Sequence, residues 1–468
     1  MTYSSGITPE LNSRFKLEQI LVIGVLIGLL FPLSASLGIT KLVTWNIPAA
    51  VLAFLLILRG LKKKQFHVGI FDLWDYSILS IIILYTVMTL LGDNVGANIS
   101  FLNSYIFCLL LALYFRRNFG KTFTAKALIL FSFITIGLES LVGLIQQITS
   151  SEFGNLAVYI GETPDSSSLR SIGETDMGRV HGTLGTGNLV GSWINMFLPF
   201  TLYASVYIKS KRLWLWQALT IIGAIIAILL TISRFNIALF LGMLLFAFAL
   251  WLRKNGSTRI GLKFRTSVVV FISILIFTGA VLTVRYWEQI GLMKQAVELR
   301  FSGTFMEAST TGEHSSGVAA RMEMNKGAIQ AFARSPIIGL GYKNSRWIWP
   351  SVDANVPKDW SYQPHNVYMI MLVEGGIFLF IAYVLFTMIP FYRLWRVRGS
   401  GDPFLLAFFL ALSASLGIQM IYITYTMPSF AAVYTMLQGV AMGYTDQLIK
   451  QKTGGGDSTS PTKVLPSP

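Results

Sequence analysis

Arg234 lies in the motif Thr231-Ile-Ser-Arg-Phe-Asn236, a tight turn between two apolar runs. Its guanidinium is permanently charged and presents a planar fork of donors, which fits a phosphate better than the ammonium group of lysine does. The motif allows two interpretations: an arginine that snorkels from a helix end, or a fixed cation that binds an anion.

His365 lies in Tyr362-Gln-Pro-His-Asn-Val-Tyr368, where a long polar segment leads into an apolar run. A histidine at a helix start often only caps or hydrogen-bonds. Its imidazole also titrates near neutral pH, so it suits a general base or neutral donor, and nearby arginines favour the neutral form. Glu374 lies nine residues after His365, about 13 Å further along a helix. We expect it to make a structural contact rather than to take part in proton transfer. Glu139, in an earlier apolar run, stays open between structure and function.

Further basic candidates lie in two long polar segments, 150–186 and 286–364. Unpaired arginines in such segments are usually solvated at little cost. Arg321 is the exception, because apolar residues recur around it near helical spacing and stop before Pro336, which predicts an amphipathic helix over 318–333 at the membrane surface. Its predicted apolar face is Val318, Met322, Ile329 and Phe332. The other basic side chains are Arg170, Arg179, His181, Arg300 and Arg334.

Several catalytic motifs are missing from the sequence. It has no Asp-x-Asp pair, no Gly-x-x-x-x-Gly-Lys phosphate-binding loop and no His or Cys spacing suited to zinc. The sequence therefore predicts chemistry without a metal or other cofactor.

The composition identifies lipid as the solvent of most of the chain. Of 468 residues, 53% are hydrophobic and 13% are charged, about half the charged share of an ordinary soluble domain. The net charge of +15 is spread between apolar runs rather than gathered on one face, so nucleic acid is not an expected partner. A single cysteine, Cys108, excludes a disulfide within the chain.

Apolar runs long enough to cross a bilayer recur along the chain. They predict an all-α polytopic fold of about twelve membrane helices, at 20–38, 43–58, 76–92, 97–114, 127–149, 187–208, 213–232, 235–252, 266–285, 366–390, 403–425 and 428–445. The expected divisions are an N-terminal segment (1–19), five helices (20–149), an outer loop (150–186), four helices (187–285), a large, partly helical outer loop (286–364), three helices (365–447) and a disordered tail (448–468).

Lys and Arg gather in alternate connections, which predicts the cytoplasmic side. These connections lie around residues 14–16, 59–64, 116–126, 209–212, 253–265, 393–398 and 450–463, whereas the short connections opposite carry only Lys41 and Arg234. Both termini are expected in the cytoplasm, and both long loops outside it.

An ordered set of motifs runs through the second half of the chain. It comprises Arg179-Val-His-Gly-Thr-Leu-Gly-Thr-Gly-Asn188, Ser233-Arg234, Arg321 followed by Pro336-Ile-Ile-Gly-Leu-Gly341, His365-Asn366, and Glu374-Gly-Gly376. In its order, its spacing and the membrane side expected for each motif, this set resembles the O-antigen ligase and polymerase superfamily of bacterial membrane glycosyltransferases. The first five apolar runs match only as generic membrane helices.

The resemblance implies transfer of a glycan from an undecaprenyl-diphosphate donor to a lipid, glycan or protein acceptor outside the cytoplasm. The setting would be cell-envelope polysaccharide or lipopolysaccharide biosynthesis at the bacterial inner membrane. Arg234 and Arg321 would bind the diphosphate and His365 would act at the acceptor or leaving group. Arg179, His181, Arg300 and Asn366 complete the expected substrate-binding set. Two alternatives stay open: a polymerase of repeat units, and a transporter of an anion or lipid-linked sugar whose arginines bind without catalysis.

Overall fold

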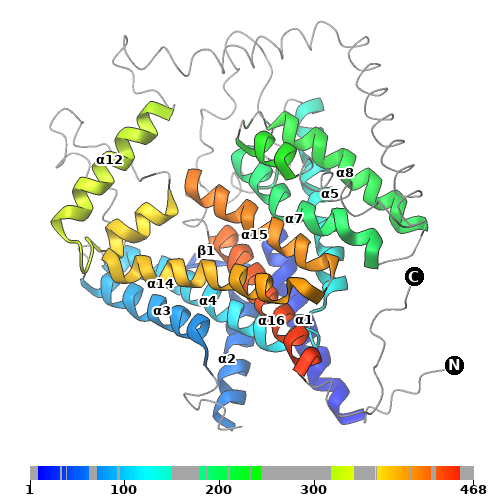
Figure 1. Cartoon of the computed structure of the whole chain (residues 1–468), viewed down its shortest axis with the longest axis horizontal. Coiled ribbons are helices and arrows are strands. Elements are labelled where there is room, and N and C mark those ends of the chain that lie inside the picture. The colour runs from blue at the N-terminus through cyan, green and yellow to red at the C-terminus, as the bar shows by residue number, and fades with distance from the viewer. Residues whose placement is uncertain are drawn as a thin grey trace, which may run out of the picture.

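The structure is a computed structural model of a helical membrane protein (Figure 1). It describes residues 9–31, 34–37, 40–62, 71–91, 95–149, 180, 182–184, 187–207, 211–231, 233, 235–243, 318–341, 364, 366–400, 402–422 and 428–453. Within this part, four helices are long and apolar enough to cross a membrane, and three further apolar helices are shorter. The chain is therefore polytopic; the number twelve stays a prediction.

The first half forms five helices and one hairpin. The helices are α1 (Pro9–Leu30), α2 (Asn46–Lys62), α3 (Leu73–Leu91), α4 (Val95–Asn118) and α5 (Ala125–Thr149). Strands β1 (Ser34–Leu37) and β2 (Thr40–Val43) pair antiparallel between α1 and α2.

The described part of the chain is built of helices, as the sequence predicts, and the short hairpin is its one addition there. The hairpin corrects the first predicted helix, 20–38. That helix ends at Leu30, two residues before Pro32, which has no N–H group to donate to a helix. At its other end α1 begins at Pro9 rather than at residue 20, so polar residues form its first turns before the apolar run starts.

The second half contains α7 (Gly187–Tyr207), α8 (Lys211–Leu230), a helical stretch at 235–243, α12 (Val318–Arg334), α14 (Val367–Val397), a 3-10 turn η4 (Arg398–Ser400), α15 (Pro403–Ile421) and α16 (Pro428–Thr453). Most predicted helices lie within a few residues of these bounds. The predicted helix at 266–285 and the end of that at 235–252 lie outside the described residues.

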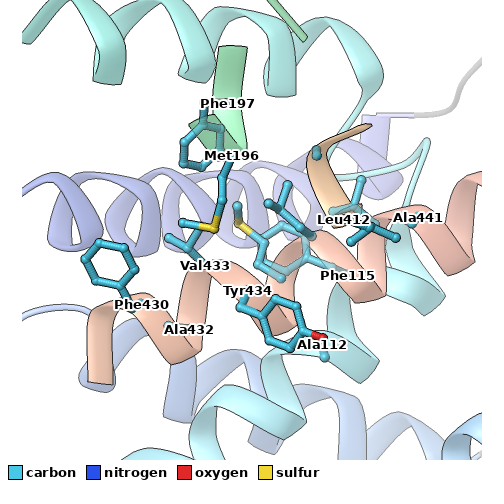
Figure 2. Close-up of a cluster of buried hydrophobic side chains, with 14 of the residues drawn as sticks. Ala112, Phe115, Met196, Phe197, Leu412, Phe430, Ala432, Val433, Tyr434 and Ala441 are labelled. Atoms are coloured by element: carbon cyan, nitrogen blue, oxygen red, sulfur yellow. The ribbon is translucent and has the colours of Figure 1, made fainter. Parts of the chain in front are cut away.

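Helix α16 lies at the centre of the bundle, and nearly every residue from 429 to 445 is buried. Small residues bring it close to α4: a Cβ on Gly439 would lie 2.8 Å from the carbonyl carbon of Ala112, and Thr435 Oγ1 donates to Cys108 O at 2.9 Å. Such close backbone approach is how helices pack in lipid, where burial of apolar surface gives no driving force. Figure 2 shows side chains of α4, α7, α15 and α16 meeting in one apolar cluster.

An ion network joins the helix ends that the basic connections assign to the cytoplasm. Arg116 at the end of α4 contacts Asp72 at 2.6 Å, Asp75 at 2.8 Å and Asp446 of α16 at 3.0 Å. Arg393 of α14 contacts Asp72 at 2.6 Å and Asp446 at 3.3 Å. These ends of α3, α4, α14 and α16 therefore lie together on one face of the bundle, as the charge alternation predicts.

Candidate functional site

The turn after α8 is held by buried hydrogen bonds at the opposite end of the bundle from the ion network. Ser233 Oγ lies 3.0 Å from Tyr422 Oη, at the C-cap of α15. Asn236 Nδ2 donates to Ser233 Oγ at 3.0 Å and to Asn188 O, in the first turn of α7, at 2.9 Å. This turn is therefore tied to two other helices by side chains that sit inside the protein.

Asn236 is fully buried and has two further partners on α7. Asn195 Nδ2 donates to Asn236 O at 3.0 Å, and Ser192 Oγ lies 3.4 Å from Asn236 Oδ1. Buried polar groups are expensive in lipid unless they are paired. The hydrogen bonds of Asn236 therefore fix the backbone of the turn after α8.

A second buried turn, residues 182–184, packs beside the first. Val180 N donates to Leu230 O at 3.4 Å. A Cβ on Gly187, the first residue of α7, would lie 2.9 Å from Val180 O and 3.0 Å from Thr231 O. The start of α7 therefore lies between the two turns, and the polar segments that precede α7 and follow α8 meet there.

Helix α5 binds this second turn with two side chains. Gln146 Nε2 donates to Gly182 O and Gly182 N donates to Gln146 Oε1, both at 2.9 Å. Thr183 N donates to Glu139 Oε2 at 3.0 Å, and Thr183 Oγ1 donates to Glu139 Oε1. Glu139, left open by the sequence, is thus a contact of this turn.

Asn366 begins α14 as its N-cap. Its Oδ1 accepts from Tyr368 N at 2.9 Å and from Met369 N at 3.3 Å, which satisfies amides that lack partners within the helix. The substrate-binding role expected for Asn366 remains a prediction beside this capping role.

Helix α14 breaks at Gly376 and a loop fills the break. Gly376 has φ +67° and ψ −167°, a conformation that glycine adopts and other residues avoid. The freed carbonyls of Val373 and Glu374 accept from Leu340 N at 2.9 Å and Gly341 N at 3.0 Å, and Ile377 N donates to Pro336 O at 2.9 Å. Non-helical backbone in a membrane helix is tolerated only when other protein groups satisfy it in this way.

Helix α12 is confirmed at Val318–Arg334, against a predicted 318–333. It packs on α14 through Ala328 and Ala331, which contact Val373. Ile329, on the predicted apolar face, is 53% exposed. The two alanines allow close helix contact, which points Ile329 away from α14.

The structure describes only some of the predicted site residues. Arg321 lies on α12, and only its backbone is described. Asn366 is described in full. Five others lie outside the described residues: Arg179, His181, Arg234, Arg300 and His365. The structure instead describes their neighbours in sequence, among them Val180, Gly182, Ser233 and Pro364.

Sequence reasoning missed Gln146 and Tyr422 as contacts of these turns. One signal was available for the first: Gln146 follows Glu139 by seven residues, so the two polar side chains fall on the same face of an otherwise apolar helix. No comparable pattern pointed to Tyr422, since an aromatic residue at a helix end is common in membrane proteins.

A family model described as O-antigen ligase matches residues 219–384. The matched segment begins in α8 and ends in α14, and it contains Arg234, Arg321, His365 and Asn366. A search of curated proteins finds no matching relative. The match confirms the resemblance over this segment. Helices α1 to α5, α7, α15 and α16 and the motif at 179–188 lie outside it.

Proposed function

From the premise that residues 219–384 carry an O-antigen ligase domain, we propose that this chain transfers a glycan from an undecaprenyl-diphosphate donor to an acceptor on the outer side of the bacterial inner membrane. The family match is the observation that carries the proposal. Support also comes from the buried hydrogen bonds around the turn at 231–236, because a phosphate site needs a fixed backbone.

The reaction is a displacement at the anomeric carbon of the donor glycan. An acceptor hydroxyl oxygen forms the new bond to this carbon as the bond to the diphosphate oxygen breaks, and undecaprenyl diphosphate leaves with the electron pair. Arg234 and Arg321 stabilise the negative charge that grows on the diphosphate. His365 accepts the proton of the acceptor hydroxyl, a task that needs only modest basicity.

The acceptor distinguishes a ligase from a polymerase. A ligase uses a separate lipid, glycan or protein, whereas a polymerase uses the end of a second lipid-linked glycan. The matched family is described as a ligase, so we assign ligation first. Polymerisation follows the same displacement with another acceptor.

The test separates donor binding from chemistry in one purified preparation. Donor affinity and single-turnover transfer are measured for the unmutated protein and for His365→Ala, with a defined undecaprenyl-diphosphate glycan and several acceptors. His365→Ala should slow transfer about a hundredfold, the usual effect of a general base. Donor affinity should change far less, because the arginines hold the diphosphate.

A matched control is His67→Ala, since His67 lies in a predicted cytoplasmic connection. It should leave both quantities unchanged. Equal losses of affinity and rate in His365→Ala would make His365 a binding residue. Firm donor binding by the unmutated protein with no product from any acceptor would identify a transporter instead.

A further inference from the structure

Helix α5 holds two buried polar side chains that the proposed reaction does not use. Glu139 is 1% exposed and Gln146 is 5% exposed, and seven residues separate them. They therefore lie on one face of the helix, about 10 Å apart along its axis. A carboxylate within a membrane helix is expensive and usually serves a specific contact.

Both side chains bind the same short turn. Gln146 bonds both the N–H and the C=O of Gly182, at 2.9 Å each. Glu139 uses one carboxylate oxygen for the amide of Thr183, at 3.0 Å, and the other for its hydroxyl. Four hydrogen bonds thus fix two consecutive residues. We name this arrangement of Glu139, Gln146, Gly182 and Thr183 the α5 clamp.

The clamp admits only glycine at position 182. Gly182 has φ +57°, which other residues rarely adopt. A Cβ there would also overlap Glu139 Oε2 and would lie 2.6 Å from Val190 Cγ2. The turn therefore seats directly on the carboxylate, without space for a side chain between them.

The clamped turn adjoins the part of the protein proposed to bind the donor. Val180 is 1% exposed and bonds Leu230 O, and the start of α7 touches both Val180 O and Thr231 O. In the sequence, Val180 and Gly182 flank His181, and Arg179 comes just before. The residues on both sides of position 181 are thus held against α5, α7 and α8.

We propose that Glu139 and Gln146 are positioning residues for glycan transfer. By clamping Gly182 and Thr183 beside the turn at 231–236, they fix the backbone where the segments before α7 and after α8 meet, next to the region proposed to bind the lipid-linked donor. The inference rests on the proposed function for its purpose, whereas the clamp itself is testable without any glycan.

The first experiment measures release of the turn with a cysteine reporter. Cys108 is the single native cysteine and is fully buried, so the unmutated protein gives the labelling background. Leu184→Cys adds a thiol at a half-buried position next to Thr183. Adding Glu139→Ala should raise its maleimide labelling rate about tenfold, because two of the bonds that hold the turn are lost.

The conservative variant and a control sharpen this test. Glu139→Gln keeps an oxygen for the Thr183 amide and an NH₂ group for its hydroxyl, so its labelling rate should stay near that of Leu184→Cys alone. Ser132→Ala removes a buried hydroxyl on the same helix that bonds only Leu128 O in the described contacts, and it should change nothing. An unchanged rate in Glu139→Ala would overturn the clamp.

The second experiment measures transfer. Glu139→Ala should lower kcat/KM about tenfold, mainly through a higher KM for the donor, and Glu139→Gln should restore most of it. Equal losses in both variants would show that the charge or a proton of Glu139 matters, and would overturn a positioning role. If Glu139→Ala does not fold, Thr183→Val removes the hydroxyl donor alone and should give a smaller loss of the same kind.

The two readouts separate failure of the inference from failure of the proposed function. Faster labelling in Glu139→Ala, with no transfer by the unmutated protein, would overturn the transferase and leave the clamp standing. Normal transfer kinetics in a folded Glu139→Ala variant with a released turn would overturn the positioning role alone.

Discussion

Ser233 and Asn236 stand on either side of Arg234 in the sequence, and their side chains reach different helices. Ser233 meets Tyr422 of α15, and Asn236 meets the first turns of α7. A snorkelling arginine needs no fixed backbone, because its long side chain finds water by itself. The fixed neighbours therefore favour the anion-binding interpretation of Arg234.

Arg234→Lys should impair transfer although the charge is kept. An ammonium group cannot reproduce two parallel hydrogen bonds to a phosphate. Loss of a fixed donor to a developing anion costs about a hundredfold in rate, so we expect a decrease approaching that size. The measurement is kcat/KM for donor in purified protein with unchanged thermal stability. Near-normal turnover would return Arg234 to the snorkelling interpretation.

Transfer should continue in the presence of EDTA. Among the described residues, no three His, Cys, Asp or Glu side chains gather as a metal site would require, and the proposed mechanism gives the charge stabilisation to arginines. The assay compares single-turnover rates with and without chelator. Lost activity that a divalent ion restores would contradict metal-free transfer.

Two segments that lie apart in the sequence, α14 around Gly376 and the loop at 335–341, form the break in α14 together. Its helical hydrogen bonds fail at Gly376, and the loop at 335–341 supplies the missing donors and acceptor. The loop contacts α14 nine residues after its first residue, about 13 Å along the helix. The segment at 335–341 therefore contributes part of a membrane helix's own hydrogen bonding.

Gly376→Ala should destabilise the protein. The backbone conformation alone costs a non-glycine residue about 1–3 kcal/mol, and an added Cβ would overlap Ile337 O and lie 2.8 Å from Gly339 N. Thermal unfolding in detergent should shift to lower temperature. Gly137→Ala is the matched control: its Cβ would meet nothing within 4 Å, in the middle of α5, and should stabilise by up to about 1 kcal/mol. Equal behaviour of the two variants would contradict a specific role for the break.

Apolar periodicity predicted the elements better than their contacts. It placed α12 to within a residue, because Pro336 ends the pattern sharply. It did not show that Ala328 and Ala331, rather than the larger apolar residues, pack on α14. It missed the partner of Gln146, which lies 36 residues later in a turn without apolar pattern. Periodicity shows which face of a helix is apolar but not which polar segment returns to it.

The ion network at the other end of the bundle couples four helices through a few carboxylates. Arg116 is the shared partner of Asp72, Asp75 and Asp446, and its guanidinium lies 5.4 Å from the ring centroid of Trp74. Burial acts to raise the pKa of Asp72. The hydrogen bond and charge of Arg116, with the charge of Arg393, outweigh it, so the pKa of Asp72 lies below its ordinary value.

The stability that Asp72 contributes should therefore be lost in acid. A carboxylate whose pKa is lower in the folded state contributes stability fully above its unfolded pKa, and this is lost as the pH falls through the folded value. The melting temperature should drop below about pH 4. Asp72→Asn should flatten this drop, whereas Asp457→Asn, in the C-terminal tail, should not. Identical pH profiles for all three proteins would contradict the assignment.

The sidedness of the whole chain is testable with reporters fused in its connections. Those near Lys63 and Lys263 should read cytoplasmic, and those near Ser166 and Ala354 should read external, because Lys and Arg in short connections are retained inside. The network around Arg116 shows that four of the relevant helix ends share a face, and the reporters determine which side that face occupies. An external reading near Lys263 would reverse the second half.

The bonds between the loop at 335–341 and α14 decide where this protein can be recombined with a relative. Exchanging the segment at 286–364 between relatives would test whether it carries acceptor preference. If the downstream junction of the graft falls after Gly341, a foreign turn lies against the break at Gly376. The carbonyls of Val373 and Glu374 can then lose their donors and stay unpaired in lipid. A junction before Val318 keeps α12, the turn and α14 as one inherited block, so chimeras cut there should insert and fold where the others fail.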